Sequence, residues 1–462
     1  MKKKATAGLK TERLNMTQAV SEFSQQALSL VQTNSSSPVF KSINAGGASA
    51  FAAMPFPTRK TEEWKYTSLH ALTKQNFNQT VEAVNVMTSA VDFTIDGLDA
   101  IQLVFVNGQY QAGLSSIESV EGLQLVRFSE ASAEQLALIE KHLGQNAETK
   151  RNLFTALNNA QVNDGVFVFV SKNTQLAKPI QIVNIAQPQA NPATAFNRCL
   201  VVLDQHAQAT IVEQFLSSDE MQNIVFNQVS EMVVGDGAHL HHYRLHKEHE
   251  SSLHFGGVYV DLNRDSQFSS YQVLLGGQIK RFDILVNHNV GGSHCEMKGV
   301  YLPKNDQHVD VHSYIEHKAP NCTTNEVYRG IMADRSKAVF NGRIHIHPDA
   351  QKTLAELSNK NLLLSDKAQI NTKPELEIYA DDVKCAHGAT VAQLNEEAKF
   401  YLRSRGISAV QADIMLSFGF INELLESISL EALRVSLRPL LAQQFTTDKS
   451  LTQHLLADDV QG

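Results

Sequence analysis

The spacing of apolar residues divides the chain into three regions. In the first, 16–160, apolar side chains recur at helical spacing over 17–31, and residues 133–158 predict a further helix. Between them, Leu103–Val106 is strand-like and ends at Asn107–Gly108, a typical hairpin turn. We therefore expect an N-terminal region that is mostly helical.

The second region, 161–390, has a sequence pattern typical of β structure almost throughout. Few of its segments are long or periodic enough for crossover helices, which disfavours a doubly wound α/β sheet. A sandwich or barrel and a parallel β-helix both remain open, because the apolar runs have no fixed repeat length. Gly, Asn and Asp separate these runs, which include Val166–Val170, Ile180–Ile185, Leu200–Leu203, Met232–Val234, Val258–Val260, Val273–Leu275, Ile284–Val286 and Leu362–Leu364.

The third region, 391–462, returns to the helical period. Asn395 can cap one helix that ends at Gly406, and Ser408 with Gln411 forms a capping box for the next. That second helix places five apolar residues on one stripe, which packs on the β core or on another subunit. The five are Val410, Ile414, Phe418, Ile421 and Leu425.

Composition narrows the class of protein. The 462 residues carry a net charge of −8, which disfavours a nucleic-acid binder. The basic start is followed by no apolar stretch, so residues 1–15 are expected to be a flexible tail, and no apolar run is long enough to span a membrane. The four cysteines form no CxxC pair, which argues against a zinc ribbon or a self-contained cluster motif and fits a reducing cytoplasm.

Several catalytic motifs are missing. The chain has no Gly-Lys dipeptide and therefore no Walker A loop. It also lacks a dinucleotide-binding fingerprint, an HExxH helix and a G-x-S-x-G elbow. We do not expect an ATPase, a dehydrogenase, a zincin or a hydrolase of these classes.

Histidines are concentrated in one stretch, with thirteen of the eighteen between His239 and His347. Two His-x-His pairs, His239 with His241 and His345 with His347, would put both rings on one face of a strand, as a cupin-like metalloenzyme requires. The alternative is that these rings occupy the outward face of half-buried strands, since isoleucines alternate with His345 and His347. We favour this alternative.

A second constellation surrounds Cys385 and His387. On a strand over 383–387 their side chains share a face, so a thiolate and an imidazole lie side by side. The pair can ligate iron, zinc or a cluster, act as a nucleophile and base, or be a buried thiol beside a hydrogen-bonded ring. Two ligands do not complete a coordination shell of about four, so the others must come from elsewhere.

The amino-acid sequence around this pair resembles that of the SufD family, which belongs to the SUF iron–sulfur cluster assembly system. The related SufB subunit lacks the Lys-Cys-x-His-Gly sequence found here at 384–388. One departure is Ala386, where many members have Ser, and it leaves both candidate ligands in place. The matching segments are 59–67, Gln307–Asp310, Phe340–Gly342, 361–366, 372–391 and 400–407.

The resemblance implies a mainly β fold, with a right-handed parallel β-helix over 161–390 between N-terminal (16–160) and C-terminal (391–462) helical regions. It also implies a non-catalytic scaffold that pairs with a SufB-type subunit through the β-helices. Copies of a SufC-type ATPase would dock on the C-terminal helices, through the stripe from Val410 to Leu425. The resemblance leaves open whether a flavin joins the complex and whether the chain forms a homodimer in isolation.

For the site, the resemblance implies that His387 ligates a transient iron–sulfur cluster at the SufB interface, with Cys385 nearby. The remaining ligands would come from SufB. The alternative from a different class is a stand-alone cupin-like enzyme that binds metal through His345, His347 and a carboxylate. A β-helical carbohydrate-active enzyme is a weaker alternative because the chain shows no secretory segment.

Overall fold

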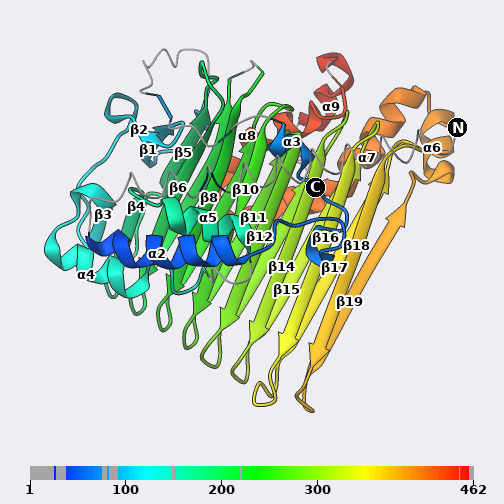
Figure 1. Ribbon diagram of the computed structural model, residues 1–462. Coiled ribbons are helices and arrows are strands. Elements are labelled where there is room, and N and C mark those ends of the chain that lie inside the picture. Colours follow the sequence, from blue (N-terminus) through cyan, green and yellow to red (C-terminus); the bar gives the residue numbers. More distant parts are fainter. Residues whose placement is uncertain are drawn as a thin grey trace, which may run out of the picture.

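The computed structural model describes residues 25, 27, 38–74, 77, 81–82, 92–147, 152–218, 221–446 and 448–456. The tail over 1–15 and nearly all of the helix expected over 17–31 lie outside the described residues. Figure 1 shows a long stack of parallel strands with helices along two sides.

The described strands form two largely parallel sheets that face each other, and successive strands from β4 to β19 alternate between them. Sheet A contains β3 (Leu123–Arg127), β4 (Val166–Val170), β6 (Ala193–Leu203), β8 (Ile224–Val234), β10 (Leu253–Leu262), β12 (Ile279–His288), β14 (His308–His317), β16 (Lys337–Ile346) and β18 (Gln369–Ile378). Sheet B contains β1 (Ile101–Val106), β2 (Gln109–Tyr110), β5 (Ile180–Ala186), β7 (Gln208–Ser217), β9 (His239–Lys247), β11 (Gln267–Leu275), β13 (His294–Tyr301), β15 (Thr323–Met332), β17 (Leu354–Leu363) and β19 (Lys384–Ala392).

This alternation is a parallel β-solenoid, which confirms the β-helix and excludes the sandwich or barrel. One strand of each sheet makes one coil, and the inward residues of both sheets form the main core. The coils differ in length, which is why no fixed repeat is visible in the sequence. Equivalent positions in sheet B are Gln267, His294, Thr323, Leu354 and Lys384, which are 27 to 31 residues apart.

The corners between strands require left-handed backbone conformations. Glycine adopts them at Gly237 and Gly292, with φ of 63° and 83°. At other corners Asn or Asp takes the same conformation, which these residues tolerate better than most. The recurrence of Gly, Asn and Asp between apolar runs is thus the sequence trace of the coil corners, and non-glycine examples are Asn173, Asp265, Asn305, Asn321 and Asp334.

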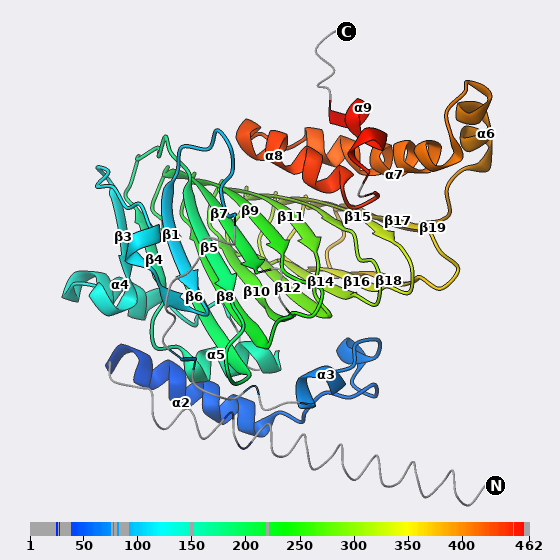
Figure 2. The same ribbon diagram turned by 90° about the horizontal axis from the view of Figure 1, so that it is seen from above.

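The N-terminal helices cover the outer face of sheet A (Figure 2). At Gly47 a Cβ atom would lie 2.4 Å from the backbone nitrogen of Ala160, so a glycine lets two of these helices pack closely. The predicted hairpin also forms, with β1 and β2 antiparallel about Asn107 and Gly108 at positive φ. The helices are α2 (Pro38–Ala53), α3 (His70–Thr73), α4 (Ala133–His142) and α5 (Leu153–Gln161).

The helix expected over 133–158 is wrong, because two helices, α4 and α5, occupy this stretch. Gly144 has a φ of 78°, and Asn152 caps the start of α5. The backbone N–H groups of Gly144 and Ala147 donate hydrogen bonds to the buried carboxylate of Glu231 on β8. A long-range contact therefore breaks the helix where local spacing predicted continuity.

The C-terminal helices cover the outer face of sheet B (Figure 2). The predicted caps are confirmed: the Asn395 side chain accepts from the N–H of Ala398, Gly406 has a φ of 87°, and Ser408 and Gln411 form a capping box. These helices are α6 (Glu396–Ser404), α7 (Ala409–Glu426), α8 (Glu431–Ala442) and α9 (Gln453–Leu456).

The two ends of the solenoid differ. At the N-terminal end the short strands β2 and β3 pair antiparallel with β1 and β4, which interrupts the parallel stack. At the other end β18 and β19 are the last strands of sheets A and B. No described strand pairs with their outer edges, so the final coil presents unpaired backbone groups. We call this the open end.

Candidate functional site at the open end

The β19 strand positions Cys385 and His387 at the open end. In the parallel register Cys385 lies opposite Ala355 and His387 opposite Leu357, both fully buried inward residues of β17. Because side chains alternate along a strand, Cys385 and His387 both project inward between the sheets. The sequence prediction that they share a face is confirmed.

The two side chains differ in burial. Cys385 is half-buried and packs against the end of the main core, and this burial raises the pKa of its thiol above the usual value. His387 is exposed, because no further coil covers it. A thiol that needs help to ionise thus lies next to a solvent-accessible imidazole.

This arrangement offers a soft sulfur donor and a nitrogen donor at the end of the molecule. Among the described residues, neither belongs to a group of three potential metal ligands. The set is therefore incomplete within this chain, as a site shared with a second molecule would be.

The surface around the pair is suited to contact with protein. The rim contains exposed apolar side chains on or beside the last strands: Leu354, Ile378, Tyr379 and Val391. Exposed edge strands with apolar side chains readily pair with another sheet. Figure 1 shows β19, in orange, at this edge.

The histidine pairs do not form a cupin-like centre. His345 and His347 lie on the outer face of sheet A, where His345 Nδ1 is 3.0 Å from Glu377 Oε2. His239 and His241 lie on β9 in the opposite sheet, so the two pairs are not brought together. Among the described residues, neither pair belongs to a potential metal group.

The expectation that the histidines face outward is nevertheless wrong for five of them. Their side chains point to the inner face of the solenoid. Because helices cover the outer faces of the sheets, both faces of a strand are buried, and sequence periodicity alone cannot distinguish them. The five inward and fully buried histidines are His242, His246, His254, His288 and His317.

Inside the solenoid a buried ionic network surrounds Glu213. Its carboxylate accepts from Arg244 at 2.8 Å and from Ser230 at 2.6 Å, and His242 Nε2 lies 3.0 Å from it. The Arg244 guanidinium lies over the rings of Phe215 and Phe282. Although burial opposes ionisation, Arg244 and these hydrogen bonds lower the pKa of Glu213 to about 2. The sequence analysis missed this network, because its charged members look like solvent-facing strand residues.

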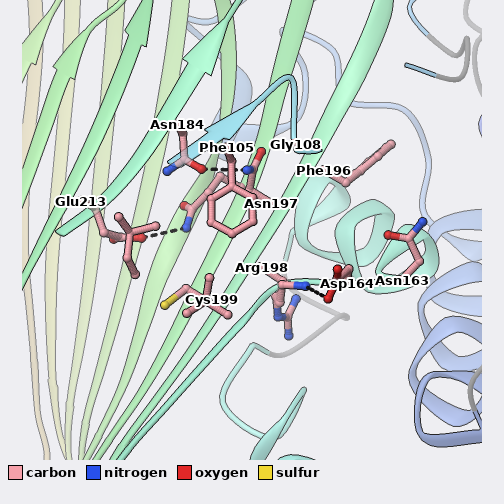
Figure 3. Close-up of a pocket in the computed structure, with 14 residues that line it drawn as sticks. Phe105, Gly108, Asn163, Asp164, Asn184, Phe196, Asn197, Arg198, Cys199 and Glu213 are labelled. Atoms are coloured by element: carbon pink, nitrogen blue, oxygen red, sulfur yellow. Dashed lines mark hydrogen bonds between the residues drawn. The ribbon is translucent and has the colours of Figure 1, made fainter. Parts of the chain in front are cut away.

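A cavity of about 410 Å³, solvent at its mouth included, leads to this network from the N-terminal end (Figure 3). Asn197 donates to the side-chain oxygen of Asn184 at 2.7 Å, and Cys199 lines the wall. Burial raises the pKa of the Cys199 thiol well above its usual value. Cys199 is therefore not an activated nucleophile.

The apolar stripe on α7 is mostly not available for docking. Phe418, Ile421 and Leu425 are buried against the outer face of sheet B, and Ile414 is buried as well, which corrects their assignment as partner contacts. Only Val410, at 58% exposure, points away. The stripe packs on its own β core because sheet B presents a matching apolar face that the sequence did not reveal.

Two segments of the resemblance that are far apart in sequence meet on sheet A. Thr67 donates to the carboxylate of Asp310 and lies 2.8 Å from His308 Nε2. Arg281 donates to the same carboxylate at 2.8 Å and to the Glu63 carbonyl at 2.8 Å. These contacts fix the N-terminal segment on the solenoid, so these segments have a structural role.

Comparison with known proteins agrees with this architecture. Residues 184–420 match the family model of the SUF system FeS cluster assembly SufBD core domain. Residues 15–182 match the SufBD protein N-terminal region. The chain belongs to the SufBD family.

Within this family the chain is similar to SufD proteins. It is 32% identical to the iron–sulfur cluster assembly protein SufD of Escherichia coli over 82% of this chain and 86% of that protein. A SufBD family protein of Synechocystis is 31% identical over 85% of this chain and 88% of that protein, and SufD of Bacillus subtilis is 27% identical over 83% and 88%. The predicted SufD resemblance is confirmed.

No described helix combines the length and apolar character needed to cross a bilayer.

Proposed function

We propose that this SufBD family protein is a non-catalytic scaffold on which an iron–sulfur cluster is built as cargo. The open end would pair with the β-solenoid of a SufB-type subunit. His387 and Cys385 would supply part of the ligand set, and the partner would supply the rest. The observation that carries the proposal is the placement of this incomplete donor pair on an uncovered edge strand.

The electrostatics support different roles for the two donors. His387 is exposed and can reach iron across an interface without rearrangement. The Cys385 thiol is half-buried with a raised pKa, so it ionises readily only when a metal ion is near. His387 is therefore the primary ligand in the proposal, and Cys385 the assisting one.

The test is cluster reconstitution on the complex assembled from this chain with its SufB-type and SufC-type partners. We expect His387→Ala to abolish cluster build-up, measured by visible absorption and iron content, while the complex still assembles. Cys385→Ser should reduce the yield less. His70→Ala, which removes an exposed histidine from α3, is the matched control and should leave the yield unchanged. A normal yield from His387→Ala would contradict the ligand assignment.

We place the ATPase contact on the exposed side of α6 and the start of α7, in place of the buried stripe. Phe400, Tyr401 and Val410 are 74%, 57% and 58% exposed and lie on two helices that contact each other. Exposed large apolar side chains in such a group are typical of an interface. Movement of the ATPase there could act on the adjacent β19, because α6 follows that strand after three residues.

Phe400→Asp combined with Val410→Asp should abolish co-purification of the ATPase subunit without changing the circular dichroism of the β core. Val435→Asp on α8, at 51% exposure, is the control and should retain binding. Retained binding by the double variant would place the contact elsewhere.

Complex formation in the cytosol agrees with the four cysteines, which are all free thiols.

A further inference from the structure

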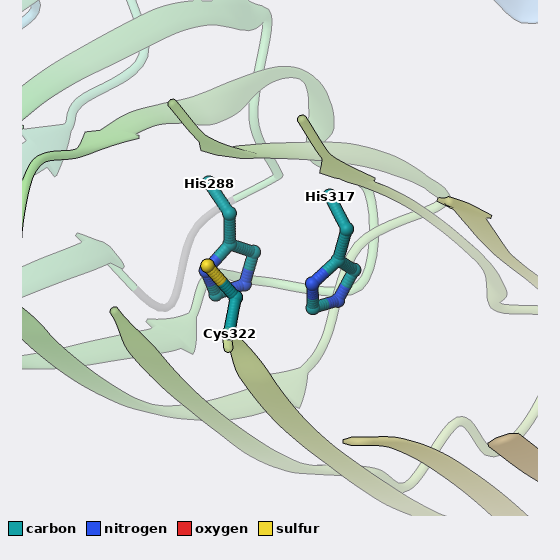
Figure 4. A group of neighbouring side chains, drawn as sticks. All are labelled: His288, His317 and Cys322. Carbon is teal, nitrogen blue, oxygen red and sulfur yellow. The ribbon is translucent and has the colours of Figure 1, made fainter. Parts of the chain in front are cut away.

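A second group of potential metal ligands lies at a corner of the solenoid, away from the open end. His288 ends β12, His317 ends β14, and Cys322 directly precedes β15. Their donor atoms lie within 4.8 Å of one another, and all three side chains are fully buried (Figure 4). We call these three residues the corner cluster.

Hydrogen bonds orient the two imidazoles alike. The rings stack with centroids 4.2 Å apart and planes 12° apart. Both Nε2 atoms lie 3.0 Å from the hydroxyl oxygen of Thr324. With both Nε2 atoms directed to Thr324, the Nδ1 atoms are left to face other groups.

The sulfur lies on the Nδ1 side of His288. The Ser293 hydroxyl is 2.7 Å from His288 Nδ1 and 3.4 Å from Cys322 Sγ, so one oxygen touches two of the three donors. His317 Nδ1 is buried and has no hydrogen-bond partner. A buried polar atom without a partner is costly, which indicates that a group normally contacts it.

Both imidazoles of the corner cluster are neutral. Burial lowers the pKa of both imidazoles, that of His317 to about 3, so both rings are in the metal-binding form at physiological pH. The other titratable groups that act on His288 are His317 and His294, both of which disfavour its protonated form. Among the described residues, no ammonium or guanidinium group lies between the three donor atoms of the corner cluster.

A second buried group of three potential metal ligands provides a comparison, because protein cations already lie beside it. In the group of His246, Glu248 and His254, the Lys280 ammonium lies 2.5 Å from Glu248 Oε2, and Arg244 donates to His246 Nε2 at 2.9 Å. His246 Nδ1 and His254 Nε2 have no hydrogen-bond partner there either, but the Lys280 ammonium already supplies a positive charge to the Glu248 carboxylate. The corner cluster has the donors without the cation.

We propose that the corner cluster binds one thiophilic divalent cation, Zn²⁺ or Fe²⁺, through His288 Nδ1, His317 Nδ1 and Cys322 Sγ. Two nitrogens and one sulfur suit these ions. Each Nε2–H would donate to Thr324, which is the usual arrangement behind a metal-bound imidazole. Ser293 is placed to approach the fourth position. On binding, the Cys322 thiol releases its proton to solvent and the thiolate pairs with the metal.

Such an ion would join two adjacent coils at a corner where the backbone turns through Gly291 and Gly292. Asn289, Lys318 and Asn321, in the connections beside the cluster, are exposed. A cation can therefore enter by local opening of the turns rather than by unfolding of the sheets. This role does not depend on the proposed scaffold function.

The test is anaerobic titration of the metal-free full-length chain with Co²⁺ in the presence of a reductant. All samples carry Cys385→Ser and His387→Ala, so the open end cannot contribute. We expect one equivalent to produce a thiolate-to-cobalt charge-transfer band and tetrahedral d–d bands, and Zn²⁺ to remove them. Affinity should rise with pH, because about one proton is released on binding.

Cys322→Ser should abolish the charge-transfer band and the rise in thermal unfolding midpoint that Zn²⁺ gives the parent protein. Thr324→Val keeps all three donors and should weaken binding by roughly 10–100-fold. It also provides the test if Cys322→Ser does not fold. Absence of a band in the parent protein, or a band unchanged in these variants, would overturn the proposal. Competition between Zn²⁺ and Fe²⁺ identifies the preferred ion.

Discussion

The guanidinium of Arg281 on β12 lies 4.8 Å from the ring centre of Trp64, the single tryptophan of the chain. The same Arg281 binds Asp283 and Asp310, so one buried cation joins the N-terminal segment to sheet A. The Trp64 ring also packs against Phe154 and Phe255, with centroids 5.6 Å and 6.5 Å away. The N-terminal segment is thus part of the folded core.

Truncation of this contact tests that role. Trp64→Ala should lower the free energy of unfolding by about 3–5 kcal/mol, because a buried indole is replaced by a cavity and a cation–π contact is lost. Urea titration followed by circular dichroism measures the change. Tyr66→Ala, at a site 47% exposed, is the control and should stay within about 0.5 kcal/mol. Equal stability of the two variants would exclude the anchoring role.

The burial of the α7 stripe predicts that substitutions on the two sides of this helix differ in their effect on stability. Ile421→Ala should lower the free energy of unfolding by about 2–5 kcal/mol, because its side chain is fully buried against sheet B. Val410→Ala, on the exposed side of the same helix, should change it by less than about 0.5 kcal/mol. If Ile421→Ala were neutral for stability but removed ATPase binding, the docking role first assigned to the stripe would be restored.

Glu326 on β15 gives stability a pH dependence. Burial raises the pKa of its carboxyl to about 7, and the nearby Ser313 offsets only part of this effect. The folded state therefore holds the proton more tightly than the unfolded state, whose pKa is near 4.5. The contribution of this group is fully present below pH 4.5 and is lost as pH rises through 7, a decrease of about 3 kcal/mol.

Glu326→Gln removes this titration. We expect the free energy of unfolding of the variant to exceed that of the parent above pH 7 and to converge with it near pH 4.5. Urea titrations at several pH values measure the difference. Glu356→Gln, an exposed outward residue of β17, is the control and should not change the pH profile. A constant offset for Glu326→Gln across pH would mean that folding does not shift the pKa of this carboxyl.

The open end predicts self-association of the isolated chain. Without its partner, the unpaired edge of β19 and the exposed Val391 favour pairing with a second copy. Sedimentation velocity should show a dimer for the parent chain and a monomer for Val391→Lys, since a lysine on an edge strand opposes pairing. Val435→Lys on α8 should leave the dimer intact. A parent chain that is monomeric at high concentration would contradict this prediction.

Local signals explain which parts of the fold were predictable. The caps at Asn395 and Ser408 and the turn at Asn107–Gly108 depend on residues a few positions apart, and the structure confirms each of them. The break between α4 and α5 was not predictable, because Glu231, which binds the intervening backbone, is 87 residues from Gly144. The coil period was hidden as well, since the turns vary in length.

The sequence by itself determined the family, the β character of the middle region and the shared strand face of Cys385 and His387, because these depend on short motifs and on the two-residue period of a strand. Only the tertiary structure decided which covered faces are interior. It turned the α7 stripe into core, buried Arg244 and Glu213 inside the solenoid, and brought His288, His317 and Cys322 together. The alternation of side chains within a strand depends on neighbouring residues. The surroundings of each face depend on how the coils stack, which brings together residues about 30 positions apart.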